Sequence, residues 1–96
     1  MKKYELLKND TVVINGSLLY KIRALKNVGY VRCGELGGFI EKEDNLSHEG
    51  SCWVDNGSCV FEEARLVDDA ITYSNSKISG KVVLSDKVKV GYNVVI

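Results

Sequence analysis

Between Asn45 and Ile96, small or aliphatic residues recur with a period of six. When hexads are counted from Asn45, the second position is always small or aliphatic and reads Leu46, Cys52, Ser58, Ala64, Ala70, Ser76, Val82, Val88 and Val94. The fourth position is aliphatic in seven of nine hexads and reads His48, Val54, Val60, Leu66, Thr72, Ile78, Leu84, Val90 and Ile96. Two such positions separated by one residue have the period of a β-strand, and the repeat of six indicates a corner after each short strand.

This repeat predicts an all-β fold in which residues 45–96 form a short parallel β-helix. Three faces close one coil of roughly eighteen residues, as in hexapeptide-repeat solenoids. The segment is long enough for about three coils. A β-meander with the same alternation is the alternative, but hexads that keep their phase to residue 96 favour the solenoid.

Residues 1–44 do not follow the repeat and predict an antiparallel β cap over the first coil. Lys3–Leu7 and Thr11–Ile14 alternate as strands do, with a turn expected at residues 9–10. Asn15-Gly16 precedes Ser17–Leu25 and is a strong signal for a two-residue hairpin turn. A cap is needed because an uncovered end of a solenoid exposes strand edges and core.

Composition places the 96 residues in a single domain, 1–96. The chain has no apolar signal region and no stretch near the roughly 20 apolar residues of a membrane span, so a cytoplasmic location is expected. Cys33, Cys52 and Cys59 include no C-x-x-C pair, which predicts free thiols and no metal site. No nucleotide-binding or hydrolase motif is present, and no cofactor is expected.

The net charge is zero but unevenly distributed. Residues 41–70 carry nine acidic and two basic residues, whereas residues 1–40 carry three acidic and seven basic ones. This argues against direct binding of nucleic acid. It also provides an acidic band that a basic protein could bind.

Large side chains at outward positions of the repeat predict a protein-binding surface. In an eighteen-residue coil, Trp53 and Ile71 stack on one face. Tyr73 stands beside them, and Phe61 points outward from the next face. Exposed aromatic and aliphatic side chains that lie together are typical of interaction surfaces. The alternative is that the cap folds over this face and buries it.

Acidic pairs at the predicted corners are included in the same protein-binding site. Glu62 and Glu63 lie at one corner, and Asp68 and Asp69 lie at the next. Such residues are typical of solvated turns. Stacked over successive coils, they would also form a negative ridge that fits a basic groove.

The last hexads predict self-association. Their apolar and aromatic residues are Val88, Val90, Tyr92, Val94, Val95 and Ile96. Bare strand edges over an apolar core associate unless they are covered. We expect a homodimer through this coil, with a side-by-side trimer as the alternative.

A further pattern runs from Ile22 to Val54 and consists of Ile22-Arg23-Ala24-Leu25, Val31, Gly34-Glu35-Leu36-Gly37-Gly38-Phe39-Ile40, Glu43-Asp44-Asn45-Leu46-Ser47 and Gly50-Ser51-Cys52-Trp53-Val54. These residues resemble the start of YdcK-like hexapeptide-repeat proteins, which occur in bacteria and in phages and other mobile elements. The resemblance implies a left-handed β-helix related to the trimeric acyltransferase superfamily. It also makes His48 the one candidate catalytic residue, because these acyltransferases use a histidine as general base. A capping or core histidine is the alternative.

Together these features predict a non-catalytic protein-binding module. From the resemblance we expect a phage or mobile-element protein that inhibits a host nucleic-acid-handling defence enzyme, in the manner of an anti-CRISPR protein. The partner would be a basic host protein. The alternatives are an acyltransferase-like enzyme that uses His48 and a structural self-assembly module.

Overall fold

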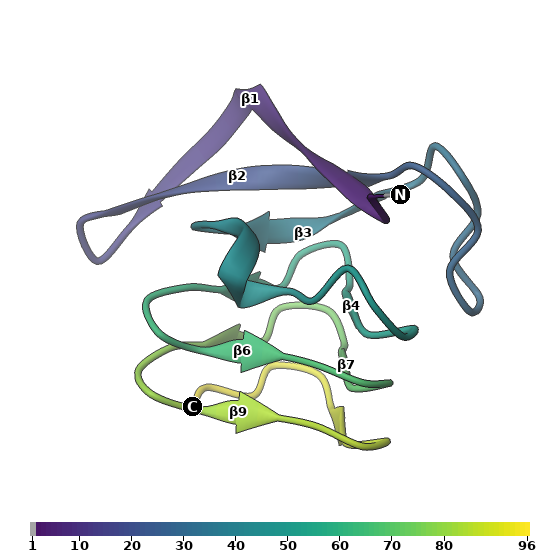
Figure 1. Ribbon diagram of the computed structural model, residues 1–96. Coiled ribbons are helices and arrows are strands. Elements are labelled where there is room, and N and C mark those ends of the chain that lie inside the picture. Colours follow the sequence, from purple (N-terminus) through teal and green to yellow (C-terminus); the bar gives the residue numbers. More distant parts are fainter. Residues whose placement is uncertain (1) are drawn as a thin grey trace.

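The computed structural model describes residues 2–96 as an all-β protein. Three longer strands come first: β1 (Tyr4–Ile14), β2 (Ser17–Ala24) and β3 (Leu36–Ile40), followed by one 3-10 turn, η1 (Glu43–Asn45). Seven two-residue strands follow: β4 (Trp53–Val54), β5 (Cys59–Val60), β6 (Arg65–Leu66), β7 (Ile71–Thr72), β8 (Lys77–Ile78), β9 (Val83–Leu84) and β10 (Lys89–Val90). Figure 1 shows the short strands stacked beneath the N-terminal sheet. Across residues 2–96, no helix has the length and apolar character needed to cross a membrane.

The N-terminal sheet begins with the predicted hairpin. β1 and β2 are antiparallel, and Ile14 lies opposite Ser17. Between them, Asn15 and Gly16 have φ values of 50° and 82°. Positive φ at both central residues is what a type I′ turn requires, so the hairpin prediction is confirmed.

The turn expected at residues 9–10 is wrong. β1 continues through these residues, and its pairing with β2 shifts between Leu7 and Thr11. Residues 8–10 are therefore inserted into one strand without partners in the other. Extra residues in one strand bend it, and Figure 1 shows β1 sharply bent.

β3 joins the N-terminal sheet to the stack of short strands. It is antiparallel to β2 and parallel to β5, where Phe39 lies opposite Cys59. Gly38 allows this approach, because a Cβ there would lie only 2.2 Å from the carbonyl oxygen of Ser58. The antiparallel sheet and the short parallel strands therefore share one strand and one continuous main core.

The short strands pair in parallel at a constant interval along the chain. Trp53 pairs with Ile71, and Ile71 pairs with Lys89, at an interval of eighteen residues. β5 pairs with β8, and β6 pairs with β9, at the same interval. This register matches the interval predicted from the hexads and is consistent with the coils of a β-helix.

Each corner of the stack contains residues with left-handed backbone, with φ between 55° and 93°. One corner has Gly50, Asp68 and Asp86, a second has Gly57, Asn75 and Asn93, and the third has Glu62 and Gly80. Within each set the members are eighteen residues apart. Glycine, asparagine and aspartate tolerate this conformation best and occupy seven of these eight positions, with Glu62 as the exception, so the corners have their own sequence repeat.

The first hexad departs from the predicted phase. Leu46, and not His48, forms a bridge with Leu66, and Leu46 is fully buried. The repeat places His48 at a fourth hexad position, which is expected to point inward, but its side chain is 26% exposed, so this expectation is wrong. The cause is two extra residues in the corner after Leu46. Leu46 keeps the interval of twenty that Ile40 and Val60 have before η1, whereas Trp53 and Ile71 pair at eighteen. Just before Leu46, η1 turns the chain. Asn45 holds this turn, because its side-chain oxygen accepts two backbone N–H groups at 3.1 and 2.9 Å.

Candidate interaction surfaces

The N-terminal part covers Trp53 and Phe61, so the exposed patch predicted around them is wrong at its centre. Trp53 is 1% exposed and belongs to the main buried cluster with Val28 and Val31. These valines come from the loop between β2 and β3, which descends beside the coils in Figure 1. Phe61 is also 1% exposed and packs with Leu19 of β2. For both residues, the alternative in which the cap buries this face is correct.

Ile71 and Tyr73 remain half-buried at the surface, with two further aromatic residues nearby. The Tyr73 ring stacks on Tyr92 with centroids 5.5 Å apart. Tyr30 is exposed in the loop between β2 and β3. Partial burial, and next the negative charge of Asp55, raise the pKa of Tyr30 to about 12. Tyr30 could not be predicted as part of this surface, because a loop that lies against a coil leaves no periodic signal in the sequence.

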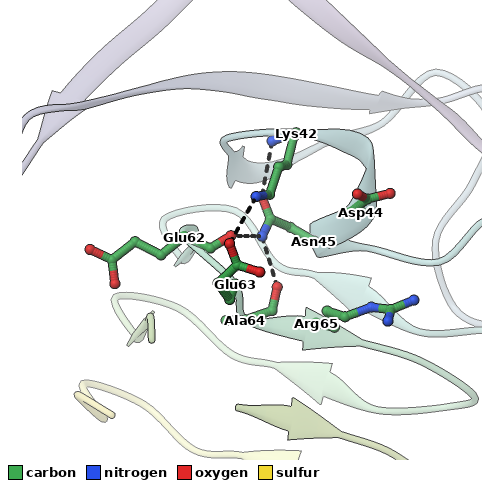
Figure 2. A pocket seen from close by; sticks show the side chains of 7 residues that line it. All are labelled: Lys42, Asp44, Asn45, Glu62, Glu63, Ala64 and Arg65. Carbon is green, nitrogen blue, oxygen red and sulfur yellow. Dashed lines mark hydrogen bonds and ion pairs between the residues drawn. The ribbon is translucent and has the colours of Figure 1, made fainter. Parts of the chain in front are cut away.

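Glu62 and Glu63 are exposed at one corner, which we call the Glu edge. Figure 2 shows them beside η1, where they line a pocket of about 170 Å³. Lys42 lies 3.7 Å from the Glu63 carboxylate, and Arg65 lines the same pocket. The Asn45 amide donates to the Glu62 carbonyl oxygen at 3.1 Å. Asp44 adds a third carboxylate to this pocket, so the two basic side chains leave a net charge of −1 at the Glu edge.

Asp68, Asp69 and Asp86 lie together at another corner, which we call the Asp edge. They line a shallow hollow that Lys87 also lines. Asp68 Oδ2 accepts the backbone N–H of Asp86 in the next coil at 3.0 Å. Asp69 Oδ1 accepts the hydroxyl and the backbone N–H of Ser51, and these bonds lower the pKa of the Asp69 carboxyl. Within residues 2–96, none of the three aspartates forms an ion pair.

His48 lies against the start of the N-terminal sheet. Its ring stacks on Tyr4 with centroids 4.1 Å apart. Its Nδ1 accepts the backbone N–H of Lys3 at 3.1 Å, so in the neutral ring the proton is on Nε2 and is donated to Glu43 at 2.7 Å. This bond, and a second one from Lys2, lower the pKa of the Glu43 carboxyl. Both ring nitrogens are engaged, which leaves no free lone pair to accept a proton.

The residues predicted to mediate self-association are mostly at the surface. Four of them are exposed: Val88, Tyr92, Val95 and Ile96. Val94 is half-buried. Val90 belongs to the main buried cluster, so its assignment to this surface is wrong. Val90 stands at a fourth hexad position and pairs with the buried Thr72. Val83 is 60% exposed and adds to the apolar surface.

All three cysteines are free thiols. Cys33 is exposed, whereas Cys52 and Cys59 are buried. Within the described part of the chain, no group of three or more histidine, cysteine or acidic side chains is arranged to hold a metal ion.

The six-residue pattern, the eighteen-residue register and the left-handed corners are together typical of hexapeptide-repeat proteins. Among known proteins, the chain is distantly similar to one from Escherichia coli (strain K12) named "Uncharacterized acetyltransferase YdcK", a hexapeptide-repeat protein, with 34% identity over 78 residues. The matched segment is 80% of this chain but 22% of that protein's length. No protein-family model matches the chain.

Proposed function

We propose that this chain is a non-catalytic module that binds a basic protein through the Asp edge. The observation that carries the proposal is the charge at this corner, where three carboxylates lie together and form no ion pair within residues 2–96. Clustered negative charge speeds association with a basic groove and selects against acidic partners. In full, we propose that the chain is a short left-handed β-helix protein of phage or mobile-element type. It would occupy the nucleic-acid channel of a defence enzyme in the host cytoplasm.

The backbone of the corner supports this proposal. Asp68 and Asp86 occupy equivalent left-handed positions in successive coils, and both are exposed. Stacked strands lie about 4.8 Å apart, so the carboxylates repeat along the stack at about that spacing. Their backbone is held by pairing in the stack, so little freedom is lost on binding. Ile71 and Tyr73 follow on the adjoining face and offer apolar contacts beside the charge.

Removing the charge without changing the corner tests the proposal. The variant is Asp68→Asn/Asp69→Asn/Asp86→Asn, because asparagine tolerates left-handed backbone and keeps an oxygen that accepts the same N–H groups. The matched control is Asn75→Asp/Asn93→Asp, which adds two carboxylates at a different corner. Tagged wild type and both variants are used to capture partners from host lysate, and the bound protein is then challenged with duplex DNA.

We expect wild type and the control to capture one stoichiometric partner that the Asp-edge variant does not capture. Duplex DNA should displace this partner. Equal capture by the Asp-edge variant would exclude the Asp edge as the binding site. A partner that DNA cannot displace would instead exclude a nucleic-acid channel as the target.

The similarity to a protein named as an acetyltransferase supports a second candidate function. In that case the chain would be an acyltransferase-like enzyme, or part of one, with His48 as general base. His48 would first have to release the Lys3 N–H, because that group occupies the one basic lone pair of the neutral ring. Saturable binding of acetyl-coenzyme A, with turnover lost in His48→Asn, would support this candidate. Absence of binding at millimolar concentrations would count against it.

A further inference from the structure

Lys3 is buried in a way that lysine seldom is. Its side chain is fully buried, although lysine is rarely enclosed without a charged partner. The Nζ atom lies 2.7 Å from the carbonyl oxygen of Cys52 and 3.4 Å from that of Gly50. It also lies 3.2 Å from the Cys52 Sγ atom. No ion pair within residues 2–96 includes Lys3, so the ionisable group that its amine contacts there is a thiol.

Cys52 is equally enclosed. Its side chain is 0% exposed, and its Sγ lies 3.5–3.7 Å from three backbone carbonyl oxygens. Loss of solvent lowers the pKa of the Lys3 amine, which raises the share of its neutral, nucleophilic form. The thiolate is the form of cysteine that reacts with oxidants. The two side chains thus pair an oxidisable sulfur with a nucleophilic nitrogen at contact distance.

We propose that Lys3 and Cys52 are a covalent modification site at which hydrogen peroxide joins the two side chains through a sulfur–nitrogen bond. In the first step, the thiolate attacks one peroxide oxygen, the O–O bond breaks, hydroxide leaves and a sulfenic acid forms. In the second step, the neutral amine attacks sulfur, the S–O bond breaks and the amine loses a proton to the departing hydroxide. Thiol, amine and peroxide become a sulfenamide and two waters. Sulfur is oxidised by two electrons, and peroxide is reduced by two.

The position of the pair suits a reversible cross-link between two parts of the fold. Lys3 precedes β1 and lies outside any strand, so local opening of residues 2–3 admits peroxide to the sulfur. Reclosure brings the amine back to the sulfenic acid. The link would connect residues 49 apart in the sequence and fasten the N-terminal sheet to the corner before β4. A thiol reductant would reverse it. This inference is independent of the function proposed for the Asp edge.

The test uses the full chain with the substitution Cys59→Ser and with the exposed Cys33 alkylated under native conditions. Cys52 is then the one remaining free thiol, so no internal disulfide can form. After treatment with hydrogen peroxide, we expect an intact mass lower by two hydrogen atoms and no tryptic cleavage after Lys3. We also expect a melting temperature several degrees higher, and dithiothreitol should restore all three properties.

Lys3→Met and Lys3→Arg in the same background are the matched variants. Methionine keeps much of the buried stem, and arginine keeps a charge but has no amine that forms this bond. Both should lack the link and instead yield a Cys52 sulfenic acid that dimedone traps. The proposal is overturned if Cys52 of the parent protein gains oxygen without a link to Lys3. It is also overturned if Cys52 stays reduced while exposed control thiols are fully oxidised.

Discussion

Thr72 places a hydroxyl group in the middle of the apolar stack. It is fully buried in β7, and its Oγ1 is the buried side-chain N or O atom within residues 2–96 that lacks a hydrogen-bond partner. Its neighbours in the ladder are Val54 in one adjacent coil and Val90 in the other. We predict that Thr72→Val stabilises the protein, because valine keeps the branched shape and completes a ladder of three valines.

Two contributions set the size of the effect. A buried hydroxyl without a partner costs roughly 1–3 kcal/mol relative to one that is hydrated. The methyl group that replaces it buries further apolar surface, which contributes about 0.8 kcal/mol. We therefore expect the free energy of unfolding to rise by about 2–4 kcal/mol. In a domain of this size, each kcal/mol raises the melting temperature by about 4–8 °C.

Urea denaturation followed by circular dichroism measures this change, provided that the slope with urea is unchanged. Val54→Thr is the matched control, because it adds the same hydroxyl one coil away and should lower stability by a similar amount. Thr72→Ser keeps the hydroxyl and removes the methyl, and should also be less stable than wild type. If Thr72→Val proved no more stable than wild type, the reasoning that the hydroxyl lacks a partner would be refuted.

Three further predictions concern the turn, the N-terminal sheet and the last coil. Asn45→Ala should lower the free energy of unfolding by roughly 3 kcal/mol in urea titration, because several buried backbone groups lose their hydrogen-bond partners. An effect under about 1 kcal/mol would contradict the role of Asn45 in holding η1. The pKa of Glu43 is lowered from its ordinary value of 4.5, chiefly by its bond with His48, so its contribution is complete above that pH and is lost as pH falls through the lowered pKa. Stability should therefore fall more steeply below pH 4.5 in wild type than in Glu43→Gln, and parallel curves would refute the link. Light scattering should show a concentration-dependent dimer that Val95→Lys abolishes, and a wild type that stays monomeric would end the self-association hypothesis.

The stacked part of the fold could be predicted from sequence, because each coil requires the same residue types at the same positions. Aliphatic residues recur at the fourth position of successive hexads, as at Val54, Val60 and Leu66, and all three are fully buried. The hairpin at Asn15-Gly16 was predictable for a similar reason, since a turn with positive φ at two adjacent residues admits few sequences. In both cases the signal lies within a few residues of the structure it specifies.

The predictions that failed concern residues whose surroundings depend on contacts between distant segments. Trp53 and Phe61 occupy outward positions in their hexads, as the repeat predicts, but outward does not mean exposed where another segment lies against the coil. Leu19 comes from a strand some forty residues earlier than Phe61, and no local pattern relates the two. His48 was misplaced because the corner between Leu46 and Trp53 has two more residues than the corresponding corner of the next coil. The alternation of apolar residues does not mark this insertion, because His48 falls in step with the later hexads.

The corners show which part of the charge pattern the fold requires. Left-handed backbone is needed at all of them, and at one corner Asn75 and Asn93 meet this need without charge. At the Asp edge, Asp68 and Asp86 meet the same need with two negative charges. Asparagine would also accept the N–H group that Asp68 accepts. The geometry of the corner therefore explains why short polar residues stand there, but it does not explain why they are acidic. The backbone does not need this negative charge, and side chains in the core do not touch it. Binding of a basic partner would explain why the charge is there.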